Sequence, residues 1–131
     1  LFPSRTAVEN LVLSQRLAGH PRGVAVDAAY RMLRRLDLLG AADRFPRELS
    51  RSEHRLACIA RAVLRRPRLL VADEPGQGLR PEAAAIAKTL LAEAVTQGAL
   101  LVMASSADEP AAPVPDTAIT LTPPATALAA C

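Results

Sequence analysis

The chain has 131 residues, a length that fits one domain, and half of its residues are hydrophobic, so a packed core is feasible. A charged content of 22% is too ordinary for a disordered tail, and no apolar run is long enough for a transmembrane helix. Aromatic residues make up only 2%, so Ala and Leu must supply most of the core. Two cysteines, Cys58 and Cys131, exclude a disulfide framework and a zinc site.

The net charge of +3 is unevenly distributed along the chain. Residues 1–70 hold 14 Arg against 6 acidic residues, whereas residues 71–131 hold one Arg and one Lys against 7 acidic residues. A basic half could bind phosphate or nucleic acid, but runs of charge are weak evidence and aromatic stacking residues are almost absent. The charge pattern therefore predicts solvated helix faces and no nucleic-acid partner.

The first third of the chain predicts two helices and no strand. Thr6 and Glu9 have the spacing of a capping box, and apolar residues then recur at helical spacing, at Val8, Leu11, Val12 and Leu17. After a break at residues 19–23, a second helix is indicated by Val26, Ala29, Tyr30, Leu33 and Leu36. Gly40 is placed to end this helix as a left-handed C-cap.

The middle of the chain predicts a third helix and then a strand. Ser50 and Glu53 form a second capping box, Pro67 ends the helix, and its apolar face holds Leu56, Ile59, Ala60 and Val63. Residues 69–72 are apolar without alternation, which is typical of a strand buried on both faces of a parallel sheet.

The order of elements indicates an α/β fold. A fourth helix is expected from Pro81 to Gly98, a second strand at residues 99–104, and a weaker strand at residues 118–121. Because strands joined through a helix make a right-handed parallel crossover, the sheet should be parallel. We expect a helical subdomain at about residues 1–66, a strand-containing part at about 67–122, and a tail at 123–131.

The most promising candidate site follows the first strand, where Asp73 and Glu74 are adjacent. Ligands of open α/β sheets bind beyond the carboxyl ends of the strands, and neighbouring strand side chains point to opposite sides. One carboxylate could therefore hold a cation while the other faces a water molecule. Mg²⁺ bound to a phosphate needs only one or two carboxylates. The alternative is a strand that simply ends in two solvated acids.

A second candidate site is the start of the helix after Ser50. A helix N-terminus offers free N–H groups and a positive dipole that favour anions, and Arg51 adds positive charge. Ser50 could therefore touch a phosphate. The alternative is that Ser50 is a plain N-cap.

Taken together, the two sites resemble the ATP-binding cassette (ABC) family. The matching residues are Leu49-Ser50-Arg51-Ser52-Glu53 at the signature, Ile59-Ala60-Arg61-Ala62, Arg66-Pro67, and Leu69 through Pro75 at the Walker B segment. Val71-Ala72-Asp73-Glu74-Pro75 further resembles the branch for lipoprotein release, macrolide export and cell division. The resemblance runs in unbroken order from residue 1, just after the family's Q-loop, to about residue 122.

This resemblance implies a role for each matching residue. Asp73 would help to hold Mg²⁺, and Glu74 would be the base that orients the attacking water. The signature residues Ser50, Arg51, Ser52 and Glu53 would meet the γ-phosphate of ATP bound to a partner subunit. The implied cofactors are ATP and Mg²⁺. The implied partners are a membrane-spanning transporter subunit and a second nucleotide-binding domain, at the cytoplasmic face of the cell membrane.

Several positions depart from the family pattern. Arg51 and Ser52 replace the signature glycines, Arg80 replaces the D-loop Asp, and Ser106 stands at the position of the switch His. No G-x-x-x-x-G-K-[ST] phosphate loop occurs in the sequence, and the family's loop would lie ahead of the residue matching Leu1. The resemblance thus predicts part of an ABC nucleotide-binding domain that lacks the Walker A strand and loop.

Two functions follow from these observations. The first is an ABC transporter ATPase subunit that is impaired in hydrolysis, with the chain alone inactive. The alternative is a non-catalytic module whose residues 6–39 dock on a cytoplasmic loop of a membrane subunit.

Overall fold

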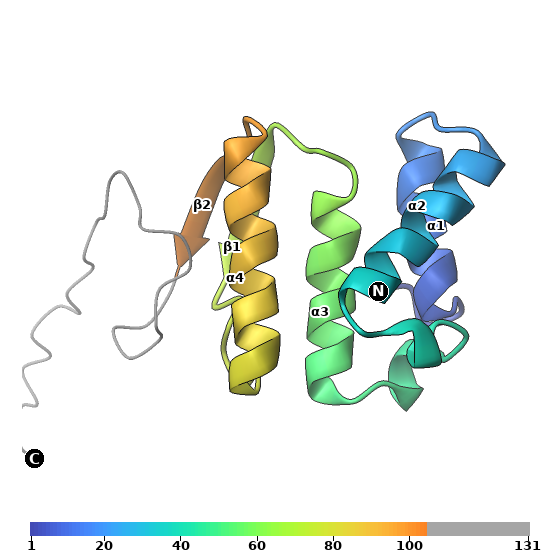
Figure 1. The fold of residues 1–131 in the computed structure, drawn as a ribbon, viewed down its shortest axis with the longest axis horizontal. Helices are drawn as coiled ribbons and strands as arrows, with labels where there is room; N and C mark the ends of the chain where they lie inside the picture. The colour runs from blue at the N-terminus through green and yellow to red at the C-terminus, as the bar shows by residue number, and fades with distance from the viewer. Residues whose placement is uncertain (105–131) are drawn as a thin grey trace, which may run out of the picture.

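The computed structural model describes residues 1–104 (Figure 1). Its elements in chain order are α1 (Ala7–Leu17), α2 (Arg22–Arg35), α3 (Arg51–Val63), β1 (Leu69–Asp73), α4 (Pro81–Thr96) and β2 (Leu100–Ala104), with short 3₁₀ turns η1 (Leu39–Ala41) and η2 (Pro46–Glu48). This order confirms the predicted α/β class. The strand predicted at residues 118–121 lies outside the described residues.

Both predicted capping boxes are present. At the start of α1, the Thr6 hydroxyl accepts from the Glu9 amide at 3.3 Å, and the Thr6 amide donates to the Glu9 carboxylate at 2.9 Å. Gly98 ends α4 as predicted. It has a positive φ of 97°, and its amide N–H donates a hydrogen bond to the Val95 carbonyl at 2.8 Å. These helix ends form locally because the residues that satisfy the free backbone groups are only a few positions away.

The predicted C-cap at Gly40 is wrong. Helix α2 ends earlier, where Asp37 takes the left-handed conformation with φ 56°, and Gly40 belongs to η1. The Leu38 amide donates to the Leu33 carbonyl at 2.8 Å, and both of these leucines are buried in the same cluster. Asp tolerates a left-handed conformation, so Asp37 can end the helix and let Leu38 join the buried cluster that holds Leu33.

The main core lies between the helices. Leu11 and Leu33 have no exposed surface, and small residues such as Ala29 and Ala60, also fully buried, occupy the helix contacts. Two residues of the apolar patterns that indicated these helices are not buried: Leu17 is 65% exposed and Tyr30 is 39% exposed. The buried line of α2 runs through Ala25, Ala29 and Leu33, which turns Tyr30 outward.

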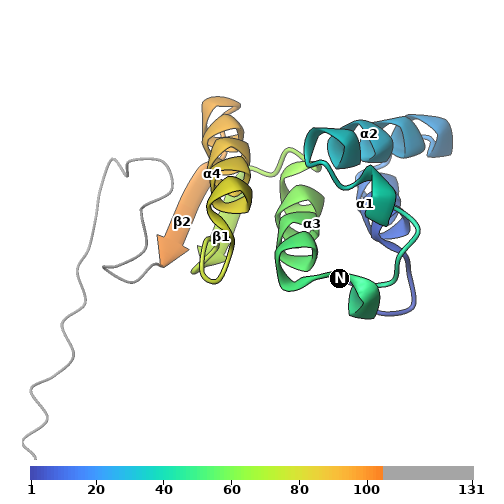
Figure 2. The ribbon, with the colours of Figure 1, turned by 60° about the horizontal axis from the view of Figure 1, so that its bottom comes forward.

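The two strands form a parallel pair joined through α4. Leu69 pairs with Leu100, and the register continues to Asp73 opposite Ala104. Figure 2 shows α4 lying against one face of this pair. On that face Leu70 is buried in a second cluster, with Leu91, Ala94 and Ala99.

The prediction that the first strand is buried on both faces is wrong for the described residues. We call the face opposite α4 the open face; it exposes Leu69, Val71, Leu100 and Val102 by 54%, 75%, 64% and 52%. Helix α4 covers only one side of the pair, and nothing else within residues 1–104 buries the other side. The apolar composition of the strand therefore exceeds what the described helices bury.

Candidate functional site

The two acidic residues lie at the carboxyl end of the parallel pair. Asp73 is the last residue of β1 and is exposed; by strand alternation it lies on the same side as Val71, on the open face. The Glu74 amide donates to the Ala104 carbonyl at 2.8 Å, so pairing extends one residue past the strand. Glu74 then takes a left-handed conformation with φ 42°, which turns the chain away from the sheet.

The loop after Glu74 folds back on that residue. The Gln77 amide N–H donates to the Glu74 carbonyl at 3.1 Å, and the Gln77 side-chain amide donates to the Glu74 carboxylate. A further turn bond joins the Leu79 amide to the Gly76 carbonyl at 3.1 Å. The carboxylate of Glu74 is thus held by a side chain from its own loop.

Ser50 is the N-cap of α3. Its hydroxyl accepts from the Glu53 amide at 3.2 Å, and its amide donates to the Glu53 carboxylate at 2.7 Å. These hydrogen bonds to Ser50 lower the pKa of Glu53, with smaller contributions from the positive charges of Arg44 and Arg80. Four of the candidate residues, Ser50, Arg51, Ser52 and Glu53, are therefore adjacent at one helix end, and Arg80 lies near enough to act on it.

Replacing Ser50 by Ala is expected to lower the free energy of unfolding by about 1 kcal/mol, because the amide of Glu53 loses its acceptor. The folded chain lowers the pKa of Glu53, so the capping box is fully effective above the unfolded pKa of about 4.3 and weakens as the pH falls through the lower folded value. Because the Ser50 side chain is the largest cause of the lowered pKa of Glu53, the loss caused by Ser50→Ala should shrink in acid. Urea unfolding measures both effects, and Ser52→Ala, a serine within the first turn, is the control that should show neither.

Two arginine contacts that were not predicted from the sequence join α3 to the loop of residues 74–79, which we call the acidic loop. The Arg55 guanidinium donates through Nη1 to the Glu74 carbonyl at 3.0 Å and also to the Gln77 carbonyl. The Arg51 guanidinium lies against Gly78, where an added Cβ would come within 3.1 Å of it. Arg51 and Arg55 are four residues apart, so their shared helix face was the available signal.

The donor set fits Mg²⁺ held together with a phosphate. Within residues 1–104, no three His, Cys, Asp or Glu side chains cluster closely enough to form a metal site by themselves. The Asp73 side chain is exposed and forms no hydrogen bond or ion pair with the described residues 1–104. Mg²⁺ commonly keeps several waters and binds one or two carboxylates plus substrate phosphates.

Ser106, at the position of the switch His, lies outside the described residues. No helix among those described, residues 1–104, is long and apolar enough to cross a membrane.

A family model described as "ABC transporter" matches residues 1–77 of the chain. The chain belongs to the ABC transporter family. The ABC match covers helices α1 to α3, strand β1 and the adjoining Glu74, so it includes the acidic pair and the start of α3.

Curated ABC relatives support the predicted branch. The lipoprotein-releasing system ATP-binding protein LolD of Paramagnetospirillum magneticum is 40% identical over 64% of this chain and 37% of its own length. The arginine transport ATP-binding protein ArtP of Haemophilus influenzae is 37% identical over 74% of this chain and 42% of its own length. The chain therefore spans less than half the length of these relatives.

Solved ABC structures share the fold. An ATP-binding subunit of an ABC transporter matches with a TM-score of 0.69 and 26% identity, over 79% of this chain and 43% of that one. A dimeric ATP-binding cassette, solved in a post-hydrolysis state with ADP and Pi, matches with a TM-score of 0.69 and 25% identity, over 79% of this chain and 47% of that one.

Proposed function

We propose that this chain contributes to an ATP-hydrolysing nucleotide-binding subunit of an ABC transporter. The observation that carries the proposal is the pair of adjacent carboxylates at the carboxyl end of parallel strands, where the Asp73 side chain is exposed and has no bonding partner within the described residues. A ligand that meets both groups must lie beyond the strand ends, where nucleotides bind to open α/β sheets.

In the proposed mechanism, the two acids have different tasks. Asp73 would help to hold Mg²⁺, which when bound neutralises charge on the phosphates. Glu74 would orient the attacking water and accept its proton through a carboxylate oxygen. For this, the side-chain amide of Gln77 must leave Glu74 or share it with the water.

The start of α3 would meet ATP bound to a second nucleotide-binding domain. Ser50, the first-turn N–H groups and the dipole of α3 favour the γ-phosphate. The Cβ atoms of Arg51 and Ser52 hinder the close backbone approach that glycines permit. We propose that these residues, with Arg80 and Ser106 at the D-loop and switch positions, reduce hydrolysis without abolishing it.

The test uses the assembled transporter and its dependence on Mg²⁺. Asp73→Asn is expected to raise the Mg²⁺ concentration for half-maximal ATP turnover by about tenfold or more, because one charged oxygen contact is weakened. Asp27→Asn, an exposed acid on α2, is the matched control. An unchanged Mg²⁺ dependence in Asp73→Asn would remove this residue from the metal site.

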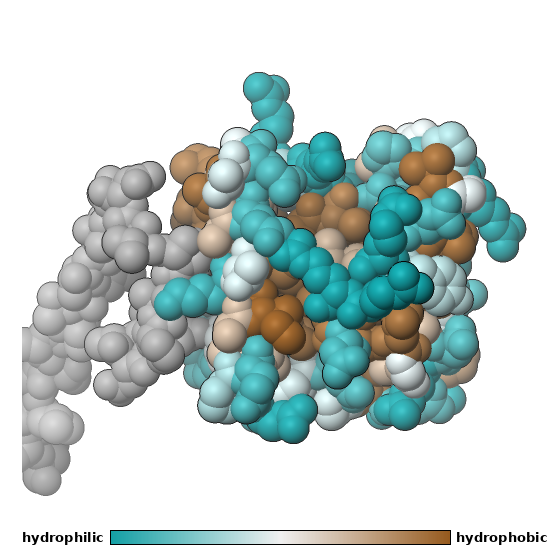
Figure 3. Space-filling model, in the orientation of Figure 1, coloured by the Kyte–Doolittle hydropathy of each residue, from teal (hydrophilic) through white to brown (hydrophobic). Residues whose placement is uncertain are grey.

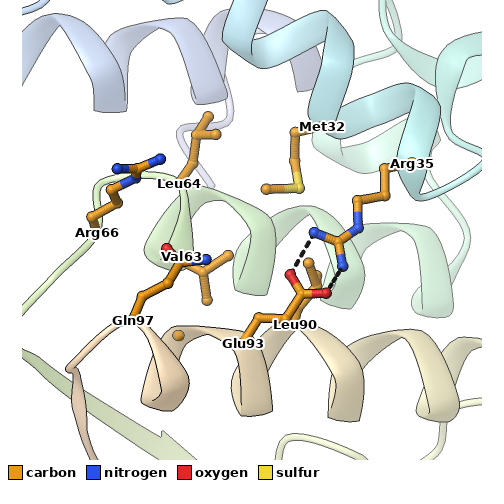
Figure 4. A pocket seen from close by; sticks show the side chains of 9 residues that line it. Met32, Arg35, Val63, Leu64, Arg66, Leu90, Glu93 and Gln97 are labelled. Carbon is orange, nitrogen blue, oxygen red and sulfur yellow. Dashed lines mark hydrogen bonds and ion pairs between the residues drawn. The ribbon is translucent and has the colours of Figure 1, made fainter.

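A groove beside the helices supports a proposal for the membrane partner. The groove has a volume of about 520 Å³ and is lined by Gln15, His20, Val24, Ala28, Arg31, Met32, Arg35, Leu64, Arg65 and Arg66; we call it the arginine groove. A smaller adjoining pocket, of about 160 Å³, extends it to α4 (Figure 4). Hydrophilic side chains lie across apolar surface on this side of the molecule (Figure 3).

The arginine groove has an excess of positive charge. Arg35 forms a two-bond ion pair with Glu93 of α4, one of its hydrogen bonds measuring 2.6 Å. This pairing raises the pKa of Arg35 and lowers that of Glu93. Arg31, Arg65 and Arg66 have no carboxylate partner within residues 1–104. We propose that an acidic, partly apolar cytoplasmic segment of the membrane-spanning subunit docks there, which would place this chain at the inner face of the membrane.

Charge reversal tests this docking proposal. Arg31→Glu combined with Arg65→Glu is expected to weaken association with the membrane subunit by about tenfold or more, and to remove its dependence on salt. Arg34→Glu combined with Arg68→Glu makes the same change of charge outside the groove and serves as control. Docking without any effect of ATP would favour the alternative function, a non-catalytic module. Equal weakening in both pairs would contradict a specific groove.

A further inference from the structure

Helix α3 reaches the loop behind the acidic pair through two side chains. Arg51 and Arg55 lie one helical turn apart and point to the same loop, where Arg51 packs on Gly78 and Arg55 bonds two carbonyls. Arg55 is half-buried, so its contacts are partly shielded from water. A guanidinium that binds two carbonyls makes charge-assisted hydrogen bonds, which are shorter and stronger than neutral ones.

We propose that Arg55 is a positioning residue for Glu74, acting on the backbone of the loop that carries this carboxylate. The inference rests on the proposed function, in which Glu74 is the base that orients water. Arg55 itself donates to the carbonyls of Glu74 and Gln77 and to neither carboxylate oxygen among the described contacts. Its effect on the reaction therefore passes through the loop.

The conformation of Glu74 shows why such support is needed. With φ 42°, Glu74 is in the left-handed region. Non-glycine residues adopt this conformation only when their surroundings impose it. Its amide is held by the Ala104 carbonyl at 2.8 Å, and its carbonyl is held by Arg55 at 3.0 Å. Both sides of the residue are thus tied, one to the sheet and one to α3.

The second Arg55 contact orients the carboxylate as well. Arg55 bonds the carbonyl of Gln77, the same residue whose side-chain amide donates to the Glu74 carboxylate. The guanidinium therefore fixes both ends of the Glu74–Gln77 turn at once. Loss of Arg55 would free the turn and let the carboxylate sample other directions, while Asp73, within the strand, would stay in place.

Since α3 begins at Ser50, Arg55 also connects the signature end of the helix to the base. A shift of α3 along its axis would move the Glu74 and Gln77 carbonyls with it. The contact predicts that the geometry of Glu74 follows the position of α3.

The test combines an exchange measurement with kinetics. Arg55→Met and Arg55→Lys are compared with Arg34→Met, because Arg34 is an exposed residue of α2 whose guanidinium has no bonding partner among the described residues. In Arg55→Met, hydrogen exchange of the Gln77 and Leu79 amides is expected to rise by about tenfold or more while the α4 amides stay unchanged. In the assembled transporter, kcat for ATP should fall by about 10²-fold with KM for ATP unchanged.

Arg55→Lys provides the rescue. A single Lys Nζ can donate to both carbonyls, as the single Arg55 Nη1 does, so exchange and kcat should recover at least partly. Unchanged exchange in Arg55→Met would overturn the inference, and so would faster exchange with normal kcat. If the unmutated transporter does not hydrolyse ATP, the proposed function fails, and any effect of Arg55 on the loop then stands as a structural contact without the positioning role.

Discussion

Replacing Glu74 by Gln is expected to lower ATP turnover by the assembled transporter by about 10²- to 10⁴-fold, the usual contribution of a positioned general base. The substitution keeps the shape of the side chain, and its amide group can still meet a hydrogen-bond partner such as Gln77. It removes the negative charge and with it the ability to accept a proton. ATP binding should therefore remain, and the measurement is single-turnover hydrolysis beside an equilibrium binding assay.

Glu82→Gln is the control for this prediction, because Glu82 is an exposed acid in the first turn of α4 and lies outside the acidic loop. It should hydrolyse ATP at the unmutated rate. Equal turnover by Glu74→Gln and the unmutated transporter would show that Glu74 is not the base. Loss of ATP binding in the same variant would instead assign Glu74 to ligand binding.

Replacing Leu33 by Ala is expected to lower the free energy of unfolding by about 2–5 kcal/mol. Leu33 is completely buried in the main cluster, and its carbonyl accepts the Leu38 amide at the end of α2. The cavity left by Ala would lie between helices whose contacts are already lined by small residues, so little side chain is available to fill it. Urea unfolding followed by far-UV circular dichroism measures the loss.

Leu17→Ala is the matched control, since this leucine is 65% exposed at the end of α1. Its effect should stay within about 0.5 kcal/mol. Comparable losses for Leu17→Ala and Leu33→Ala would contradict the helix packing described above. The pair thus tests which face of the first two helices is buried.

Features that depend on nearby residues could be predicted from the sequence. The capping boxes at Thr6 and Ser50 and the glycine at the end of α4 involve partners only three positions away. The end of α2 could not be placed in this way. There Asp37, and not Gly40, takes the left-handed conformation that ends the helix, and Leu38 is buried in the same cluster as Leu33.

The position of the acidic pair at the carboxyl end of β1 was predictable, because an apolar run that stops at two acids and a proline is typical of a strand end. The spacing of Arg51 and Arg55 on one helix face could be read from the sequence, but the bonding partners of Arg55 and Gln77 could not, because a long side chain can reach many places and tertiary structure sets its partner. The burial of β1 was overestimated for a different reason. An apolar pattern indicates that both faces of a strand can be buried, but within residues 1–104 helix α4 covers only one face of β1.

The open face also governs how this polypeptide behaves in solution. Four aliphatic side chains stand beside strand edges that, within residues 1–104, have no further neighbour in the sheet. Such a surface attracts other copies of the same chain, so isolated material should self-associate increasingly as it is concentrated. The Asp73 carboxylate at the end of this face is charged and hydrated, which opposes close stacking at that end and leaves the aliphatic middle as the point of first contact.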